Sequence, residues 1–94
     1  MNRVTHDTNS RKFSLTEEDR EAFLSYSEIG SEIWNLTHTF VPAHLRGKGL
    51  AEVLTRAALE AAKAEGKKIV PSCSYVESFL KRKGKEYSGL VAHP

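Results

Sequence analysis

A strand, a glycine turn, a long helix and a second strand follow one another through the middle of this chain. Glu32 to Val41 alternates polar and apolar side chains, as a half-buried strand does. Leu50 to Glu65 carries apolar residues at helical spacing, and Ile69 to Cys73 is a short apolar run. Because a helical crossover between two strands of one sheet leaves them parallel, the order predicts a βαβ unit.

The flanking segments predict antiparallel strands before this unit and a short helix after it. Lys12 to Leu15 and Glu21 to Ser27 are expected strands, joined by an acidic turn at Thr16 to Asp19, so together they predict a hairpin. Tyr75 to Arg82 has the spacing of a short helix. Residues 1–10 are polar and aperiodic, which predicts a disordered tail, and residues 11–94 are expected to form a single domain. The expected fold class is α/β.

The spacing also predicts which side chains share a face. In the strand before the glycine turn, the side chains expected on one face are Trp34, Leu36, His38 and Phe40. The expected apolar stripe of the long helix consists of Leu50, Leu54, Ala57, Ala58, Ala61 and Ala62. Gly66 is placed to end this helix in a left-handed conformation.

Composition limits the classes of protein to which the chain can belong. Its 94 residues suffice for one domain, and its 39% hydrophobic content suffices for one modest core. No apolar run approaches the ~20 residues that span a bilayer, and the N-terminus lacks the apolar stretch of a secretory signal, so we expect no membrane association. A single cysteine excludes an internal disulfide and favours the cytosol. A net charge of +2 does not by itself indicate nucleic acid.

The glycine turn has the features of an anion site. Gly47 and Gly49 lack a Cβ, so their backbone can adopt positive φ and approach a ligand closely. The first amides of the following helix have no partners within it, and the helix dipole favours negative charge there. Arg46 and Lys48 add positive charge. The alternative is a plain turn in which glycine only relieves strain, but the whole context favours a pyrophosphate site.

The turn from Arg46 to Ala51 also resembles the R/Q-x-x-G-x-G/A signature of the GNAT acetyltransferase superfamily. Two strand-end motifs, residues 38–42 and 71–75, resemble those of its minimal single-domain members in plants, animals and bacteria. The resemblance runs from about Phe13 to Leu90 and implies a truncated GNAT fold, whose two parallel strands splay apart around the pantetheine of coenzyme A. The cofactor-binding residues implied are Phe40, Val41, Pro42, Leu45, Arg46, Gly47, Lys48, Gly49, Leu50, Ala51, Ser74 and Tyr75.

The resemblance implies an acetyl-CoA-dependent N-acetyltransferase that acetylates a primary amine by direct transfer in a ternary complex. The expected partners are coenzyme A and an amine acceptor such as a protein lysine or a polyamine, with a monomer favoured. Larger members have two helices between their first strands, which wall the acceptor site. Only Thr16 to Arg20 occupies that stretch here, so we expect an open acceptor side.

His38 and Cys73 are the expected catalytic residues. They lie on two strands that we expect to be adjacent, so the two side chains are expected to approach one another. His38 is expected to be a general base or a relay, and the alternative is a core histidine. Cys73 is expected near the acetyl group, either as a nucleophile that forms an acetyl-cysteine or as a small buried residue. Tyr75 is interpreted either as a packing residue or as the acid that protonates the departing thiolate.

Other readings of the sequence remain open. One is a coenzyme A-binding module or sensor without efficient catalysis. Another is a small basic protein that binds RNA through Lys81 to Lys85, although the aromatic motifs of RNA-binding modules do not accompany these cations. The remaining histidines have no metal-ligand spacing with Cys73, so we expect no metal site.

Overall fold

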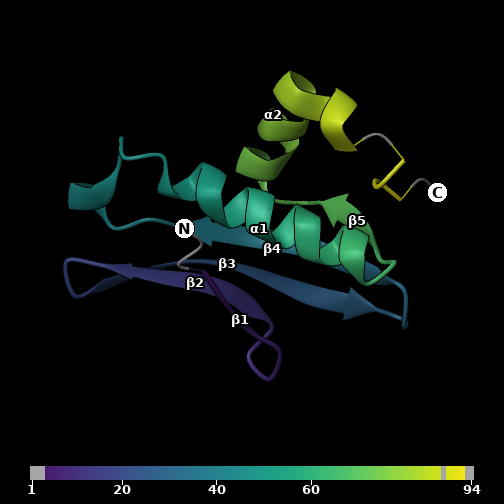
Figure 1. The fold of residues 1–94 in the computed structure, drawn as a ribbon, viewed down its shortest axis with the longest axis horizontal. Helices are drawn as coiled ribbons and strands as arrows, with labels where there is room; N and C mark the ends of the chain where they lie inside the picture. Colours follow the sequence, from purple (N-terminus) through teal and green to yellow (C-terminus); the bar gives the residue numbers. More distant parts are fainter. Residues whose placement is uncertain (1–3, 88, 93–94) are drawn as a thin grey trace.

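The computed structural model describes residues 4–87 and 89–92 of the chain. Within these residues, one five-stranded sheet has the strand order β1-β2-β3-β4-β5 (Figure 1). Its strands are β1 Thr5–Asp7, β2 Lys12–Glu17, β3 Arg20–Ile29, β4 Ile33–Phe40 and β5 Lys68–Pro71. The helices are α1 Leu50–Ala64 and α2 Ser74–Lys83, with short 3-10 helices η1 Ala43–Leu45 and η2 Gly84–Tyr87.

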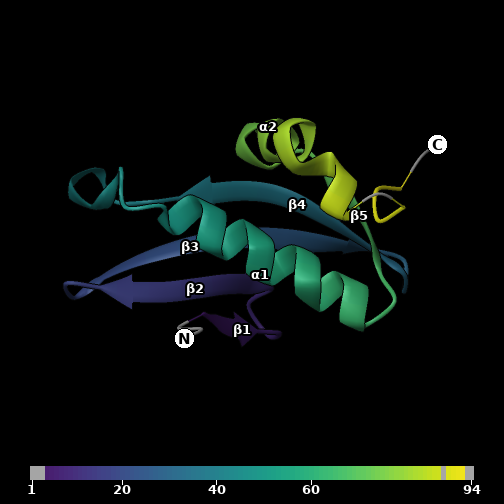
Figure 2. The same cartoon turned by 45° about the horizontal axis from the view of Figure 1, so that its top comes forward.

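The topology confirms the expected α/β fold class. Strands β1 to β4 are antiparallel neighbours, and β4 pairs with β5 in parallel through the crossover helix α1. Figure 2 shows α1 running across the sheet, and in Figure 1 both helices lie on the same side of it. Neither helix in the described part of the chain combines the length and the apolar character needed to cross a membrane.

A bulge in β4 reverses the faces expected for the end of this strand. Leu36 pairs with Tyr26 and His38 pairs with Ser25, so Thr37 is an extra residue on β4. An extra residue shifts the two-residue alternation by one, which turns the following side chains to the opposite face. Trp34 and Leu36 are therefore buried as expected, whereas His38 is exposed on the other side of the sheet. The expectation that His38 and Phe40 share the face of Leu36 is wrong.

The expected tail contains a strand instead. Thr5–Asp7 pairs with β2, and the ring of His6 stacks on Phe13 with 4.1 Å between centroids. His6 Nε2 also lies 2.6 Å from Tyr26 Oη, so one side chain fixes this edge strand to the core. A three-residue strand held by such contacts has too little periodicity to be predicted. Residues 1–3 of the expected tail, and residues 88, 93 and 94 of the expected domain, lie outside the described residues.

The stretch expected to connect the first two strands, Thr16 to Arg20, connects the second and third strands instead. The first two strands are β1 and β2, and they are joined by residues 8–11, not by Thr16 to Arg20. The latter stretch instead contains the tight turn of the β2–β3 hairpin, in which Glu18 and Asp19 have φ values of 51° and 63°. Both connections are too short to hold a helix.

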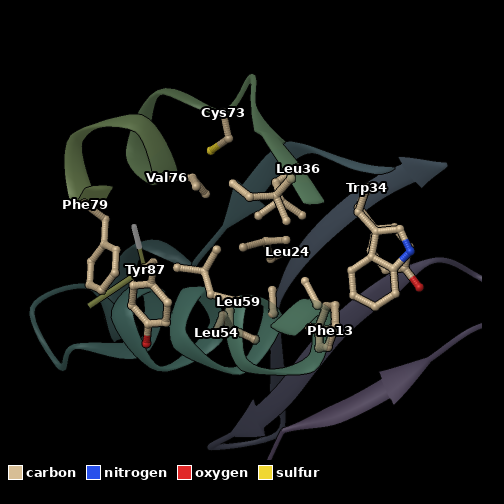
Figure 3. Close-up of a cluster of buried hydrophobic side chains, with 14 of the residues drawn as sticks. Phe13, Leu24, Trp34, Leu36, Leu54, Leu59, Cys73, Val76, Phe79 and Tyr87 are labelled. Atoms are coloured by element: carbon tan, nitrogen blue, oxygen red, sulfur yellow. The ribbon is translucent and has the colours of Figure 1, made fainter. Parts of the chain in front are cut away.

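Helix α1 buries a wider arc than its expected apolar stripe. The buried residues are Leu50, Leu54, Thr55, Ala58, Leu59 and Ala62, whereas Ala57 and Ala61 are only half-buried. Figure 3 shows Leu54 and Leu59 of α1 in one cluster with Val76 and Phe79 of α2. Because α1 packs against both the sheet and α2, its buried side is rotated toward α2. Thr55 satisfies its buried hydroxyl by donating to Ala51 O at 2.8 Å.

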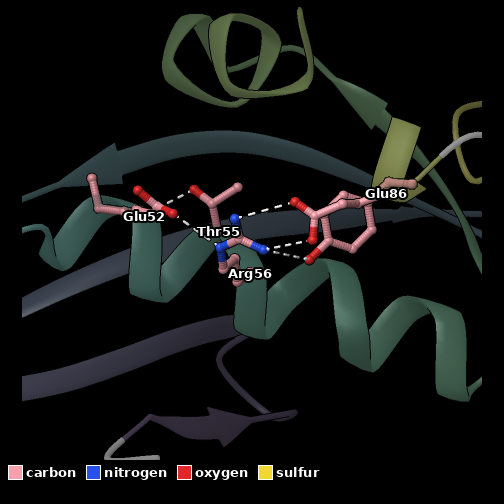
Figure 4. Close-up of polar contacts among 6 residues, drawn as sticks. Glu52, Thr55, Arg56 and Glu86 are labelled. Atoms are coloured by element: carbon pink, nitrogen blue, oxygen red, sulfur yellow. Dashed lines mark hydrogen bonds and ion pairs between the residues drawn. The ribbon is translucent and has the colours of Figure 1, made fainter. Parts of the chain in front are cut away.

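Arg56 connects α1 to the C-terminal part of the chain (Figure 4). Its Nε donates to Glu52 Oε2 at 3.0 Å, one helical turn earlier. Its Nη1 and Nη2 donate to the two carboxylate oxygens of Glu86 at 3.0 and 3.3 Å. The hydrogen bonds from Arg56 lower the pKa of the Glu86 carboxyl below its ordinary value of 4.5. A bidentate pair of this kind fixes the orientation of both groups.

We expect Glu86→Gln to lower the free energy of unfolding near neutral pH and to have little effect in acid. Because folding lowers the pKa of Glu86, its contribution is present above about pH 4.5 and is lost as the pH falls through the folded value. Urea unfolding of both proteins across this range measures the difference. Glu77→Gln is the control, since Glu77 has no ion pair among the described residues. A difference that does not change with pH would contradict the assignment.

Candidate functional site

The two parallel strands separate at the middle of β4. Their pairing extends from Ile33 opposite Lys68 to Leu36 opposite Pro71, and Cys73 N then donates to Leu36 O at 2.8 Å. Beyond this point β4 continues to Phe40, whereas the other chain turns into α2. The stretch 37–40 therefore has no strand partner on its β5 side among the described residues. An open strand edge offers backbone donors and acceptors to an extended ligand.

The glycine turn has the conformation that its sequence indicates. Gly47 and Gly49 have φ values of 89° and 78°, in the region that glycine adopts readily. A Cβ at either position would meet no described atom within 4 Å, so the space in front of both residues is open. Gly49 is the N-cap of α1, and no side chain among the described residues caps this helix.

The backbone amides of Leu45 and Arg46, two of the implied cofactor-binding residues, are not free. Leu45 N donates to Pro42 O at 2.9 Å and Arg46 N donates to Ala43 O at 3.3 Å, so both are used within η1. Val53 N makes the first backbone bond into α1, to Gly49 O at 3.1 Å. By helix geometry the amides of residues 50–52 therefore point out of the helix end. The anion-binding donors are predicted at residues 47–52 and not at 45–46.

A cavity of about 210 Å³ lies in front of this helix end. It brings together the end of β4, the glycine turn and the first turn of α2. Its lining residues are Val41, Leu45, Arg46, Gly47, Gly49, Leu50, Ala51, Glu52 and Tyr75. Eight of the twelve predicted cofactor residues thus surround one cavity, and the other four, Phe40, Pro42, Lys48 and Ser74, are not part of its lining. Glu52 is a lining residue that the sequence analysis missed.

Both cations of the turn have protein partners in this structure. Arg46 Nε donates to Val41 O at 3.0 Å, which ties the turn to the end of β4. Lys48 Nζ lies 2.6 Å from Glu18 Oε2, in the turn between β2 and β3. The hydrogen bond from Lys48 lowers the pKa of Glu18 below its ordinary value, and the same bond raises the pKa of Lys48. Glu18 therefore competes with any anion for Lys48.

We expect Glu18→Gln to tighten binding of a phosphate-bearing ligand at this turn by about two- to fivefold, which is the range that an exposed ion pair allows. The substitution frees Lys48 and removes one negative charge near the site. Isothermal titration with acetyl-coenzyme A measures the change. Glu28→Gln is the matched control, because it also removes one carboxylate from an exposed ion pair, that with Arg11 in another part of the sheet. Equal affinities of the two variants would contradict the competition between Glu18 and the ligand.

Cys73 lies beside the point where the strands separate. It is the N-cap of α2 and is 8% exposed, and Figure 3 shows it at the rim of the core cluster near Val76. Its Sγ lies 3.3 Å from Thr39 Oγ1. The bulge at Thr37 turns the side chain of Thr39, instead of that of His38, to the face of the sheet on which Cys73 lies. Thr39 is the second site residue that the sequence analysis missed.

The structure does not bring His38 and Cys73 together. The ring of His38 packs at 6.0 Å from the ring of Phe23, on the side of the sheet away from the helices. His38 is therefore neither a core histidine nor a partner of Cys73. The thiol has no described base beside it, which leaves the expected activation of Cys73 by His38 without geometric support. The described residues also contain no group of three or more His, Cys, Asp or Glu side chains arranged to bind a metal ion.

The chain matches the sequence profile of GCN5-related N-acetyltransferases over residues 12–90. It belongs to this family. The matched residues include the glycine turn and both parallel strands.

Comparison with individual proteins agrees with this assignment. Protein NATD1 of Mus musculus is 39% identical over 82 residues, which cover 84% of this chain and 74% of that protein. Protein NATD1 of Homo sapiens is 38% identical over 82 residues, covering 84% and 72% of the two chains. The solution structure of a GCN5-like protein from Staphylococcus aureus has a TM-score of 0.74 and 26% identity, and the match covers 97% of this chain and 88% of that one. The GCN5-related fold is thus shared along nearly the whole chain.

Proposed function

We propose that this protein is an acetyl-CoA-dependent N-acetyltransferase that transfers the acetyl group directly to a primary amine. The observation that carries the proposal is the cavity at the uncapped start of α1, because it adjoins the open edge of β4. A helix N-terminus with glycines in front of it suits a pyrophosphate. An open strand edge leading away from that point suits the amide groups of pantetheine. Membership of the GCN5-related family supports both assignments.

The residues have separate roles in this proposal. The amides of residues 47–52 hold the pyrophosphate, and Tyr75 closes the side of the cavity formed by α2. The backbone of residues 37–41 aligns the pantetheine arm along β4. The bound thioester supplies the acetyl group, which forms a C–N bond with the amine as the C–S bond breaks and coenzyme A leaves as the thiolate, which takes a proton from solvent. His38 accepts the proton that the amine must lose.

The geometry supports direct transfer over an acetyl-cysteine intermediate. A cysteine nucleophile for acyl transfer is usually paired with a base that accepts the thiol proton, and the N-terminus of α2, where Cys73 lies, supplies a dipole but no base. The described neighbour of Cys73 Sγ is the hydroxyl of Thr39, which is not a base at neutral pH. We therefore assign Cys73 and Thr39 to the wall beside the acetyl group. The amine then attacks the thioester itself.

Two measurements on the whole chain test the proposal. Isothermal titration with acetyl-coenzyme A, and with acetylpantetheine as the control without the nucleotide phosphates, measures binding. Release of the coenzyme A thiol with and without a lysine amide measures turnover. We expect tight binding that requires the phosphates, and thiol release that requires the amine. Binding without amine-dependent release would favour a coenzyme A-binding module, and absence of binding would overturn the proposal.

A further inference from the structure

The face of the sheet away from α1 and α2 carries an exposed aromatic cluster. Phe40 is 40% exposed, and its ring lies 5.6 Å from that of Phe23. The ring of Phe23 is also 6.0 Å from that of His38. The register places Ser14 opposite Phe23 and Ser25 opposite His38 on the same face. We call this surface, formed by Lys12, Ser14, Glu21, Phe23, Ser25, His38 and Phe40, the open face.

An ammonium group of the protein itself occupies the open face. Lys12 Nζ lies 5.5 Å from the centroid of the Phe23 ring. The same nitrogen donates to Glu21 Oε1 at 3.2 Å. Because Lys12 pairs with Ser25, its side chain runs along β3 across Phe23 to reach Glu21. The surface thus holds an aliphatic stem against an aromatic ring, and it holds the ammonium between that ring and a carboxylate.

The open face adjoins the point where the parallel strands separate. His38 follows directly after the bulge, and β4 loses its β5 partner at the same place. Cys73 and Thr39 lie on the helix side of this gap, whereas His38 lies on the open side. A base on the open side can take a proton only from an amine that arrives from that side. An acceptor amine that uses His38 as its base must therefore approach from the open face.

We propose that the open face binds the amine acceptor as a lysine side chain, with its stem on Phe23 and Phe40 and its ammonium near Glu21 and His38. This inference rests on the proposed acetyltransferase function and adds the acceptor surface to it. Lys12 occupies part of this surface in the free protein and competes with the acceptor. An acceptor lysine has the same aliphatic stem and ammonium group as Lys12, so it can make the same contacts with Phe23 and Glu21.

Steady-state kinetics with Nα-acetyl-lysine methylamide test the surface through changes of opposite sign. Phe23→Leu keeps an apolar side chain but removes the aromatic ring, and Glu21→Gln removes the carboxylate. We expect each to raise the KM for the lysine amide about two- to fivefold. Lys12→Gln removes the competing ammonium and is expected to lower this KM by a similar factor. The Kd for acetyl-coenzyme A is expected to stay constant in all three variants.

Lys85→Gln is the control for loss of one positive charge, since Lys85 lies in η2, away from the open face. A KM that rises or stays constant in Lys12→Gln would overturn the proposal, because a purely structural role of Lys12 cannot lower it. A KM for spermidine more than tenfold below that for the lysine amide would also overturn it. If Phe23→Leu does not fold, Glu21→Gln and Lys12→Gln still test the surface.

A titration followed by amide chemical shifts separates this proposal from the proposed function. The lysine amide is expected to shift residues 21–25 and 38–40 in the wild-type chain, and its Nε-acetylated form is expected to shift them much less. A protein that binds acetyl-coenzyme A but lacks these shifts would overturn only the acceptor surface. A protein that shows these shifts but does not bind acetyl-coenzyme A would overturn only the acetyl transfer.

Discussion

Ala51→Glu is expected to weaken binding of acetyl-coenzyme A by about 100-fold or more without unfolding the protein. Ala51 lines the cavity in the first turn of α1, so a carboxylate there would meet the pyrophosphate of the proposed complex. Two unit charges 4 Å apart repel by about 4 kcal/mol at an effective dielectric constant of about 20, and salt reduces this value. A glutamate in the first turn also complements the helix dipole, so the fold is not weakened. Isothermal titration measures the affinity.

Ala51→Gln separates charge from size in this experiment. Glutamine has the length of glutamate but no charge, so we expect a loss of less than about tenfold. Thermal unfolding of the two variants without ligand is expected to differ little from that of the wild type. Equal losses in both variants would indicate crowding of the cavity and not charge repulsion. Wild-type affinity in Ala51→Glu would place the phosphates elsewhere.

His38→Gln is expected to lower kcat by about 100-fold or more, since general bases typically contribute factors of 10²–10⁴. His38 is exposed and lies on the side of the sheet away from the core, so its replacement leaves the fold intact. It also lies outside the cavity at the glycine turn, so the Kd for acetyl-coenzyme A is expected to stay constant. Thiol-release kinetics and isothermal titration measure the two quantities on one protein sample.

Cys73→Ala provides the contrast to His38→Gln. Direct transfer needs no thiol, so we expect a loss of kcat of less than about tenfold, caused by the altered wall next to Thr39. An acetyl-cysteine route would instead abolish turnover in this variant and produce a burst of thiol release in the wild type. Loss of activity in Cys73→Ala with full activity in His38→Gln would reverse our assignment of the two residues.

The elements of the βαβ unit could be predicted because each is long and periodic. The helix expected from Leu50 to Glu65 is observed as Leu50–Ala64, and Gly66 follows it with a φ of 72°. β1 could not be predicted, since its three residues have no pattern of their own and depend on the contacts of His6 with Phe13 and Tyr26. The local sequence pattern therefore identifies long periodic elements, whereas a short strand held by tertiary contacts escapes it.

The candidate site was predictable in its backbone and not in its side-chain partners. The glycine turn can be recognised in the sequence by Gly47 and Gly49, because glycine readily adopts the positive φ that both residues have. The bulge at Thr37 leaves no trace in the sequence, because threonine is an ordinary strand residue and the alternation continues through it. That one residue decides whether His38 or Thr39 faces Cys73. The ion pair of Lys48 with Glu18 likewise depends on the tertiary fold.

A titration of the isotope-labelled protein with acetyl-coenzyme A, followed by its backbone amide shifts, locates the bound cofactor. The claim tested is that the cofactor lies across the start of α1 and along the open edge of β4. We predict the largest shifts at residues 47–52 and 37–41, with the former lost when acetylpantetheine replaces the cofactor. Shifts confined to Lys81–Lys85, or no shifts at the glycine turn at saturation, would contradict the claim.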